Sequence, residues 1–297
     1  MNDRSLLGSA GGMVFAGSPL DRCEVLRRDE VLLAAEAEKP EARILHLHQG
    51  DPEVDDDGLT WHPLDHAAKQ DPGRIFLGQL NGQPLFALPG PMSGQHIPAR
   101  AAAMQIPHQD AAIYAQAKSV LDWHYRHQFC ARCGSPTNMA AGGAKRVCPS
   151  CETEHFPRVD PVVIMLAQHE DQVLLGRQAS WPPGVWSALA GFVEPAETLE
   201  EACARELSEE AGLAVDIAAT RYILCQPWPF PSSLMVGLLA PATSPDLTVD
   251  TEELEAARWF SRADVIAMLD GKHPHAALPP SIAIARRLVE LWAAEKV

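Results

Sequence analysis

Three glutamates stand close together in the second half of the chain, Glu206, Glu209 and Glu210. On a helix, residues three and four positions apart share one side, so these carboxylates are expected to face the same way. Glu209 and Glu210 would then fall in the last helical turn, where the helix dipole disfavours negative charge, and like charges four positions apart also repel each other. A solvated acidic face is the usual explanation of a glutamate run, but a bound cation relieves both conflicts. Carboxylates suit Mg²⁺ or Mn²⁺, which also bind waters and substrate phosphates.

The helix that carries these glutamates has its own boundary signals. Thr198 followed by Glu201 forms a capping box that predicts its start, and Gly212 is placed to end it. The apolar residues expected on the other side of this helix are Cys203, Ala204, Leu207 and Ala211. The pattern predicts a helix that packs against a core on one side and presents acidic groups on the other.

Four of the seven cysteines form two close pairs, Cys130 with Cys133 and Cys148 with Cys151. Two such knuckles can supply four thiolates to one tetrahedral Zn²⁺. A disulfide framework is the alternative, but it needs an oxidising compartment, and the other three cysteines are scattered. We therefore expect a zinc site, and because its four ligands are all cysteines, we expect a structural one.

Composition excludes several classes of protein. The net charge of −15 over 297 residues argues against bulk nonspecific binding to nucleic acid, which needs a basic surface. No apolar run reaches the ~20 residues that span a bilayer. The segment Leu6–Gly17 is interrupted by glycines and preceded by an acidic as well as a basic residue, so it matches a secretory signal poorly. We expect a cytoplasmic protein without a membrane segment.

Strand-like runs and turn signals predict three consecutive domains. Residues 1–125 are interpreted as a β-rich domain with a connecting helix, 126–157 as the zinc ribbon, and 158–297 as an α/β domain. The predicted strands are 43–47, 74–80, 84–88, 162–167, 172–176, 186–190, 221–225, 234–240 and 257–260. Helices are predicted to start at Asp110, Ser261 and Ser281.

A segment with alternate prolines follows one of these strands and reads Gln226-Pro-Trp-Pro-Phe-Pro231. The prolines fix φ, so Trp228 and Phe230 project in a preset direction. Rigid aromatic faces can stack a nucleobase for ~1–3 kcal/mol each. The alternative is a stiff loop whose aromatic rings only cover the edge of a core.

Residues 191–213 read GFVEPAETLEEACARELSEEAGL and fill every fixed position of the Nudix box, G-x5-E-x7-R-E-U-x-E-E-x-G-U with U aliphatic. With the cysteine pairs before the box and the proline-aromatic segment after it, the chain resembles the NADH pyrophosphatase branch of the Nudix hydrolases from about residue 100 to its end. Cys225 stands where the family usually has Ser, which puts only a local hydroxyl contact in doubt.

The resemblance implies a Nudix α/β/α sandwich with a mixed sheet, preceded by the ribbon and the β-rich domain. It also implies a homodimer. The implied catalytic residues are Glu210, Glu209 and Arg205, and the implied Mg²⁺ or Mn²⁺ ligands are Ala190 through its carbonyl, Glu206, Glu209, Glu210 and Glu253. The implied substrate-binding residues are Phe156, Phe192, Gln226, Pro227, Trp228, Pro229, Phe230, Pro231, Ser232, Ser233, Ala285 and Arg100.

The implied reaction is hydrolysis of the diphosphate of NADH or NAD⁺ to AMP and nicotinamide mononucleotide, with NAD-capped RNA as a further substrate. Two alternatives stay open. The nearer is a Nudix hydrolase of ADP-ribose or dinucleoside polyphosphates, which the box alone does not exclude. The farther is a zinc-ribbon module that binds nucleic acid through Arg132, Lys145 and Arg146, which the acidic balance and the complete glutamate set disfavour.

Overall fold

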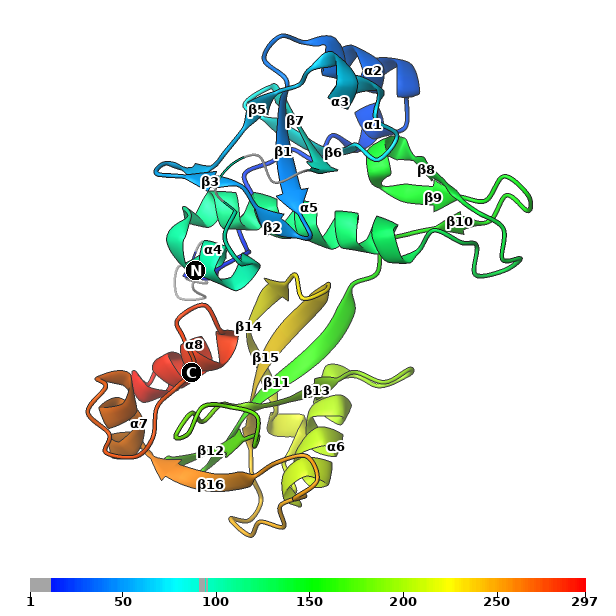
Figure 1. Ribbon diagram of the computed structural model, residues 1–297. Helices are drawn as coiled ribbons and strands as arrows, with labels where there is room; N and C mark the ends of the chain where they lie inside the picture. The colour runs from blue at the N-terminus through cyan, green and yellow to red at the C-terminus, as the bar shows by residue number, and fades with distance from the viewer. Residues whose placement is uncertain (1–11, 91–93, 95) are drawn as a thin grey trace, which may run out of the picture. The chain divides into compact units, whose positions relative to one another are not determined.

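The computed structural model describes residues 12–90, 94 and 96–297, and these divide into two compact units that we describe separately (Figure 1). The C-terminal unit consists of Asp160–Gln226 and Ser233–Val297. The N-terminal unit consists of the described residues up to Val159 together with Pro227–Ser232. The segment Leu6–Gly17 begins outside the described residues. Within the described ranges, every helix is too short or too polar to cross a bilayer.

A six-stranded mixed sheet forms the centre of the C-terminal unit, in the order β14-β15-β11-β12-β16 with β13 also paired to β11. Its strands are β11 (Asp160–His169), β12 (Gln172–Arg177), β13 (Leu189–Phe192), β14 (Arg221–Trp228), β15 (Ser233–Pro241) and β16 (Ala256–Ser261). β11 and β15 run parallel, and β11 and β12 form an antiparallel hairpin that turns at Glu170 and Asp171. The predicted mixed sheet is confirmed.

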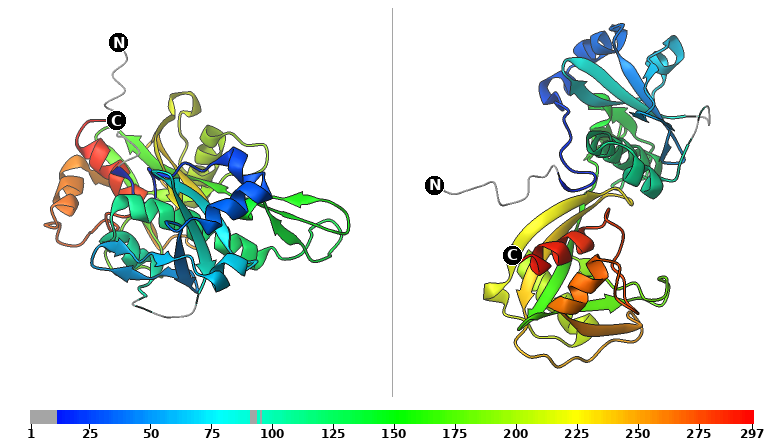
Figure 2. Two further views of the ribbon diagram at one scale, coloured as in Figure 1. Left: turned by 90° about the horizontal axis from the view of Figure 1, so that it is seen from above. Right: turned by 90° about the vertical axis from the view of Figure 1, so that its left-hand side faces the viewer.

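The central strand β11 is buried on both faces, which explains its continuous apolar sequence. Val163, Met165 and Ala167 lie in the same core cluster as Cys203 and Leu207 of helix α6 (Leu199–Ala211). The alternate residues of β11 face the opposite side of the sheet. Helix α8 (Ile284–Ala293) contacts β11 and β15, and α7 (Arg262–Leu269) packs beside α8 (Figures 1 and 2). The sheet is therefore covered by α6 on one face and by α8 with α7 on the other.

The N-terminal unit contains a five-stranded sheet in the order β2-β1-β7-β6, with β5 paired to β1. Its strands are β1 (Arg43–His48), β2 (Asp51–Pro52), β5 (His62–Pro63), β6 (Ile75–Leu80) and β7 (Gln83–Pro89), and β3 (Val54–Asp55) pairs with β4 (Gly58–Leu59) as a separate ribbon. The helices are α1 (Glu24–Arg27), α2 (Glu30–Glu38), α3 (His66–Gln70), α4 (Ala99–Gln105) and α5 (His108–Arg126). The β-rich character is confirmed, and the helices α1 to α4 were not predicted.

A small three-stranded sheet follows α5 in the same unit and carries the paired cysteines. It consists of β8 (Asn138–Ala140), β9 (Lys145–Val147) and β10 (Glu154–His155). β9 pairs antiparallel with both neighbours, so the second cysteine pair lies in the connection between β9 and β10. This is the layout expected of a ribbon that folds around one metal ion.

Several predicted boundaries were wrong. The strand predicted at 221–225 continues to Trp228 as β14, so the proline-aromatic segment begins inside this strand rather than after it. Helix α5 starts at His108, because the carboxylate of Asp110 accepts the distant Leu59 N–H at 3.0 Å instead of capping its own helix. Helix α8 starts at Ile284 rather than near Ser281. The strand predicted at 186–190 is β13, which begins at Leu189, because the residues before it form only an isolated bridge. At Asp110 and at the start of α8, hydrogen bonds to distant residues overrule the local signals.

Candidate functional site

Helix α6 is built as the sequence predicts. The Thr198 hydroxyl accepts the N–H of Glu201, the Glu201 carboxylate accepts the N–H of Thr198, and Gly212 ends the helix at φ 64°. The helix buries Cys203, Leu207 and Ala211, but Ala202 is fully buried where Ala204 was expected. Because cap and core contacts fix both ends and one face, the glutamates on the remaining face have a defined position.

Arg205 is the centre of the hydrogen-bond network on α6. Its guanidinium donates to Glu197 from Nε at 2.6 Å and from Nη2 at 3.0 Å. Nη1 donates to Glu206 at 2.8 Å and to Glu209 at 3.0 Å. Nη2 also donates to the carbonyl of Phe192 at 2.8 Å. The hydrogen bonds to Glu197, and then those to Glu206 and Glu209, raise the pKa of Arg205, so it stays charged.

Glu210 differs from its two neighbours. It is 7% exposed, whereas the side chain of Glu209 is 61% exposed. Within the described ranges its carboxylate makes no hydrogen bond or ion pair, and Arg205 does not reach it. Burial, followed by repulsion from Glu206, Glu253 and Glu209, raises the pKa of Glu210 to about 8. A buried carboxyl beside three others is an unfavourable arrangement that positive charge would relieve.

The box glycine explains how Glu206 reaches the backbone of β13. A Cβ added at Gly191 would lie 1.8 Å from the Glu206 Cδ, so only glycine leaves room for this carboxylate. Ala190, the residue whose carbonyl is an expected ligand, lies next to it on β13 and is paired with Ile164. Burial is also the first cause of a raised pKa at Glu206.

Glu253 lies in a turn before β16, and backbone hydrogen bonds hold this turn against the end of α6. The N–H of Asp250 donates to the carbonyl of Glu210 at 2.9 Å, and the N–H of Leu254 donates to the carbonyl of Asp250 at 2.9 Å. Glu253 lies in the turn between them and is exposed. The C-terminal unit thus gathers Ala190, Glu206, Glu209, Glu210 and Glu253, and their hard oxygens fit Mg²⁺ or Mn²⁺.

The carboxylates are gathered but are not drawn into a tight cluster. Among the described residues, the cysteines form the one group of three or more potential ligands whose donor atoms all lie within 4.8 Å of one another. The reason is Arg205, which holds Glu206 and Glu209 while Glu210 points into the protein. The expectation that Glu206, Glu209 and Glu210 converge on one side is therefore met only in part.

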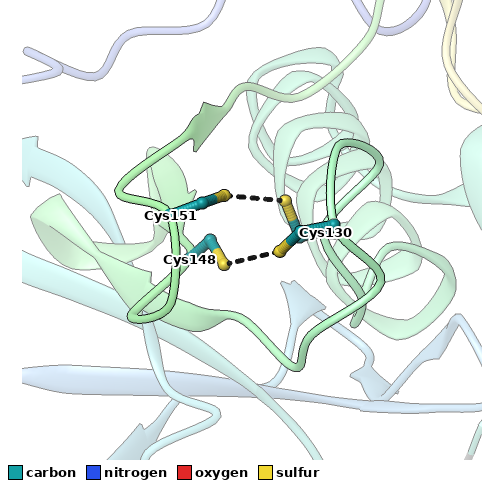
Figure 3. A group of neighbouring side chains, drawn as sticks. Cys130, Cys148 and Cys151 are labelled. Atoms are coloured by element: carbon teal, nitrogen blue, oxygen red, sulfur yellow. Dashed lines mark hydrogen bonds between the residues drawn. The ribbon is translucent and has the colours of Figure 1, made fainter.

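The four cysteine sulfurs face one another in the N-terminal unit (Figure 3). Cys130 Sγ lies 3.6 Å from Cys151 Sγ, and Cys133 Sγ lies 3.5 Å from Cys148 Sγ. Four sulfurs at the usual Zn–S distance would be about 3.8 Å apart, so the donor set fits zinc. The hydrogen bond between Thr153 and Cys151 lowers the pKa of that thiol to about 6, whereas burial raises the pKa of the Cys148 thiol to about 11, so Cys151 is the readier of the two to supply a thiolate.

Arg146 connects the ribbon to helix α5. It donates to the hydroxyl and carbonyl oxygens of Thr137 at 2.7 and 2.6 Å, and its Nη1 donates to Nδ1 of His124 at 3.2 Å. His124 Nε2 donates in turn to the carbonyl of Gly143 at 2.8 Å. Arg146 was considered above as a nucleic-acid contact, but these bonds give it a structural role.

The proline-aromatic segment belongs to the N-terminal unit from Pro227 to Ser232, and its two aromatic side chains are half-buried there. The rings of Trp228 and Phe230 lie 5.2 Å apart, edge to face. The guanidinium of Arg100 lies over both rings, at 5.8 Å from Trp228 and 5.2 Å from Phe230. The structure therefore brings together Arg100 and the two aromatic residues, which the resemblance implied as substrate-binding residues without indicating that they touch.

The remaining predicted substrate residues have varied surroundings. Gln226 is fully buried, donates to the carbonyl of Ile282 at 2.7 Å and accepts the N–H of Ile284 at 3.0 Å, so it holds the start of α8. Ser232 donates to the carbonyl of Arg158 at 2.8 Å. Ser233 and Ala285 are buried in the C-terminal unit. Phe192 in that unit and Phe156 in the N-terminal unit are each 60% exposed.

Sequence reasoning missed two residues of these networks. Glu197 is the main partner of Arg205, and its fixed place in the box was the available signal. Phe15 packs against Trp228 and Phe230, each at 5.9 Å between ring centroids. No motif or periodicity surrounds Phe15, so only the folded structure reveals it.

Three family models match consecutive parts of the chain. Residues 20–123 match a NADH pyrophosphatase-like rudimentary NUDIX domain, 126–156 a NADH pyrophosphatase zinc ribbon domain, and 157–280 a NUDIX domain. The match at 20–123 covers a region in which the sequence alone suggested no more than a β-rich domain. The ribbon match coincides with the four-cysteine cluster.

Several curated proteins are similar to this chain. The NAD-capped RNA hydrolase NUDT12 of Macaca fascicularis is 48% identical over 206 residues, which cover 66% of this chain and 44% of that protein. The NAD-capped RNA hydrolase NudC of Stutzerimonas stutzeri is 37% identical over 74% of this chain and 78% of its own length. The protein of the same name from Mycobacterium bovis is 37% identical over 92% of each. The chain spans less than half the length of the NUDT12 relatives. These matches extend over all three parts of the chain, and they agree with the geometry of the glutamate helix. The chain therefore belongs to the Nudix hydrolases, in the branch whose members carry the NADH pyrophosphatase zinc ribbon.

Proposed function

We propose that the protein hydrolyses the diphosphate bond of NADH and NAD⁺, giving AMP and nicotinamide mononucleotide, and that it removes NAD caps from RNA by the same cleavage. The observation that carries the proposal is the buried, unpaired Glu210 beside Glu206 and Glu253. The similarity to NAD-capped RNA hydrolases and to an NAD(P)H pyrophosphatase supports the choice of substrate.

The proposed mechanism assigns a role to each group of residues. Mg²⁺ or Mn²⁺ would be held by Glu206, Glu209, Glu210, Glu253 and the Ala190 carbonyl, and would supply charge neutralisation of the diphosphate and activation of water. Glu210 or Glu209 accepts the proton of the attacking water. Arg205 orients Glu206 and Glu209 through the hydrogen bonds described above.

The aromatic pair is proposed to recognise the dinucleotide by stacking. The other residues proposed to bind substrate are Phe156, Phe192, Gln226, Pro227, Pro229, Pro231, Ser232, Ser233, Ala285 and Arg100. Because the Trp228 ring also packs within the N-terminal unit, Trp228→Ala is expected to lower stability and to raise KM for NADH. A lower melting temperature with an unchanged KM would assign the ring to packing alone.

We further propose zinc as the resident ion of the ribbon, a homodimer, a cytoplasmic location, and domain boundaries at 1–125, 126–157 and 158–297. The paired thiols support the first proposal and the family resemblance supports the second. A relative, the NAD(P)H pyrophosphatase NUDT13, is mitochondrial by name, so location is to be measured by fractionation rather than transferred. Light scattering coupled to size exclusion tests the dimer.

The decisive experiment incubates purified full-length protein with NADH, NAD⁺, ADP-ribose and NAD-capped RNA, each with Mg²⁺ and with Mn²⁺, and separates the products. AMP and nicotinamide mononucleotide are expected from the dinucleotides, and a 5′-monophosphate end from the RNA. Glu206→Gln should abolish these products, and Glu200→Gln, in the first turn of the same helix, should not. Cleavage of ADP-ribose alone would overturn the proposal and favour the broader Nudix alternative.

A further inference from the structure

Three aromatic rings from distant parts of the chain form one cluster in the N-terminal unit. Phe15 meets Trp228 at 5.9 Å with an interplanar angle of 80°, and Phe230 at 5.9 Å with an angle of 71°. Trp228 and Phe230 meet at 5.2 Å and 66°. Each pair is close to edge-to-face, the arrangement that aromatic quadrupoles favour. Phe15 is thus the common neighbour of both rings of the proline-aromatic segment.

The three rings differ in how they are buried. Phe15 is 2% exposed, whereas Trp228 and Phe230 are half-buried and keep surface open to solvent. A fully enclosed ring beneath two partly exposed ones supports them from within, and it has no surface left with which to touch a ligand. Phe15 can therefore act on a ligand only through the orientation of its two neighbours.

The backbone of Phe15 is held in a conformation that favours glycine. Its φ is 73°, in the left-handed region, which costs energy for a large side chain and persists only where surrounding contacts impose it. The turn is closed by the N–H of Ala16, which donates to the carbonyl of Met13 at 3.1 Å. The chain thus adopts an unfavourable turn that directs this ring between the other two.

Basic side chains complete the cluster from the outside. Arg100 lies over both rings, as described above, and Lys118 Nζ lies 5.7 Å from the centre of Phe230. The Ser119 hydroxyl donates to the carbonyl of Pro231 at 3.4 Å. Cations over aromatic faces are attracted by the ring quadrupole. Each ring is therefore held by an edge-to-face contact with Phe15 and by at least one cation over its face, so each has a defined plane.

We propose that Phe15 is a positioning residue for substrate recognition, which sets the orientation of Trp228 and Phe230 for stacking. The inference rests on the proposed function, in which these two rings recognise the dinucleotide. Pre-orientation by a buried neighbour lowers the entropy that a stacking platform loses when it binds. Phe15 would thus contribute to affinity without contacting the substrate.

The test compares Phe15→Leu, which removes the ring and keeps an apolar side chain, with Phe15→Tyr, which keeps the ring. The matched control is Phe76→Leu, which removes a buried ring that packs on Phe86 in the same unit and touches neither Trp228 nor Phe230. Loss of an edge-to-face pair should raise KM by about 3- to 10-fold in Phe15→Leu, with kcat within about two-fold of wild type. Phe15→Tyr should retain the wild-type KM, and so should Phe76→Leu even if it melts earlier.

A second readout follows the orientation of Trp228 directly and needs no turnover. Full-length protein labelled with fluorotryptophan contains seven fluorinated rings, and Trp228→Phe identifies the resonance of Trp228. Phe15→Leu should shift or broaden that resonance, and Phe15→Tyr and Phe76→Leu should leave it in place. An unchanged Trp228 resonance in folded Phe15→Leu overturns the proposal. A changed resonance with unchanged KM also overturns it, because Phe15 would then only fill space.

The same set of variants separates this proposal from the proposed function. The kinetic measurements use whichever dinucleotide the wild-type protein cleaves, so a failure of NADH as a substrate does not remove the test. If Trp228→Ala leaves KM unchanged, recognition by the aromatic pair is wrong, and the role of Phe15 is wrong with it. If Trp228→Ala raises KM and Phe15→Leu does not, only the positioning role is rejected.

Discussion

Arg205 and Glu197 are joined by two parallel hydrogen bonds, which connect the loop before helix α6 to its middle. This paired geometry fixes the plane of the guanidinium and points Nη1 at Glu206 and Glu209. The orientation of both glutamates therefore depends on Glu197, which acts on them only through the guanidinium of Arg205. Arg205 also stays bonded to the carbonyl of Phe192, so strand, loop and helix are held at one point.

Arg205→Lys should lower kcat/KM for NADH by about 10- to 100-fold, because an ammonium cannot bond Glu197 in parallel and still reach both glutamates. Glu197→Gln should act in the same direction by a smaller factor. The control is Arg262→Lys, a partly buried arginine of the same unit that pairs with Asp171 through Nε at 2.7 Å. Steady-state kinetics that show equal losses in Arg205→Lys and Arg262→Lys would contradict the orienting role.

Glu210→Gln should lower kcat by about 10²-fold or more while the protein remains folded. Burial and neighbouring carboxylates oppose the charge of Glu210, so its removal should not lower the melting temperature measured without added Mg²⁺ or Mn²⁺. The stabilisation that either cation gives wild-type protein should shrink in the variant. Ser208→Ala, at an exposed position of the same helix, is the control. A folded Glu210→Gln protein with near-full activity would rule out the assignment.

Cys148→Ser should reduce the zinc content from roughly one ion per chain and lower the melting temperature, because a hydroxyl is a poor substitute for a thiolate. Cys23→Ser is the control, since Cys23 lies outside the four-cysteine group. Elemental analysis and thermal denaturation measure both effects. Active wild-type protein without zinc, or a disulfide between Cys130 and Cys151, would be incompatible with this prediction.

His124 should make stability sensitive to mildly acidic pH. Burial lowers its pKa to about 4, whereas the unfolded chain has the ordinary value of about 6.5. Below pH 6.5 the unfolded state therefore binds a proton that the folded state does not, so stability falls as the pH decreases from 6.5 towards 4. The loss should be about 2 kcal/mol between pH 7 and pH 5.

His124→Gln should remove most of that pH dependence, because glutamine can still donate to the Gly143 carbonyl without titrating. His66→Gln, at an exposed histidine of α3, is the control for the loss of one imidazole. Denaturant unfolding at pH 5 and pH 7 measures the difference for each protein. A wild-type-like fall in stability in His124→Gln would show that other groups cause it.

Features with local causes were predictable from the sequence. The capping box of α6 and its glycine end depend on residues within one helix, and the cysteine spacing defines its own cluster. Features that depend on distant partners were not predictable. Asp110 looks like a helix cap, but Leu59 recruits its carboxylate across 51 residues. The contact of Phe15 with Trp228 joins segments more than two hundred positions apart, and neither segment contains a sign of the other.

Among the described residues, the chain passes between the two units at Val159–Asp160, Gln226–Pro227 and Ser232–Ser233. The six residues Pro227–Ser232 are flanked in the sequence by residues of the C-terminal unit, but they pack within the N-terminal unit. A fragment cut at residue 158 would carry Trp228 and Phe230 without Phe15, Arg100 or Lys118, and would expose two large rings to water. Excising the Nudix domain as an independent minimal enzyme would therefore produce an aggregation-prone fragment. A shortened version of this protein would need Pro227–Ser232 redesigned as well as its new N-terminus.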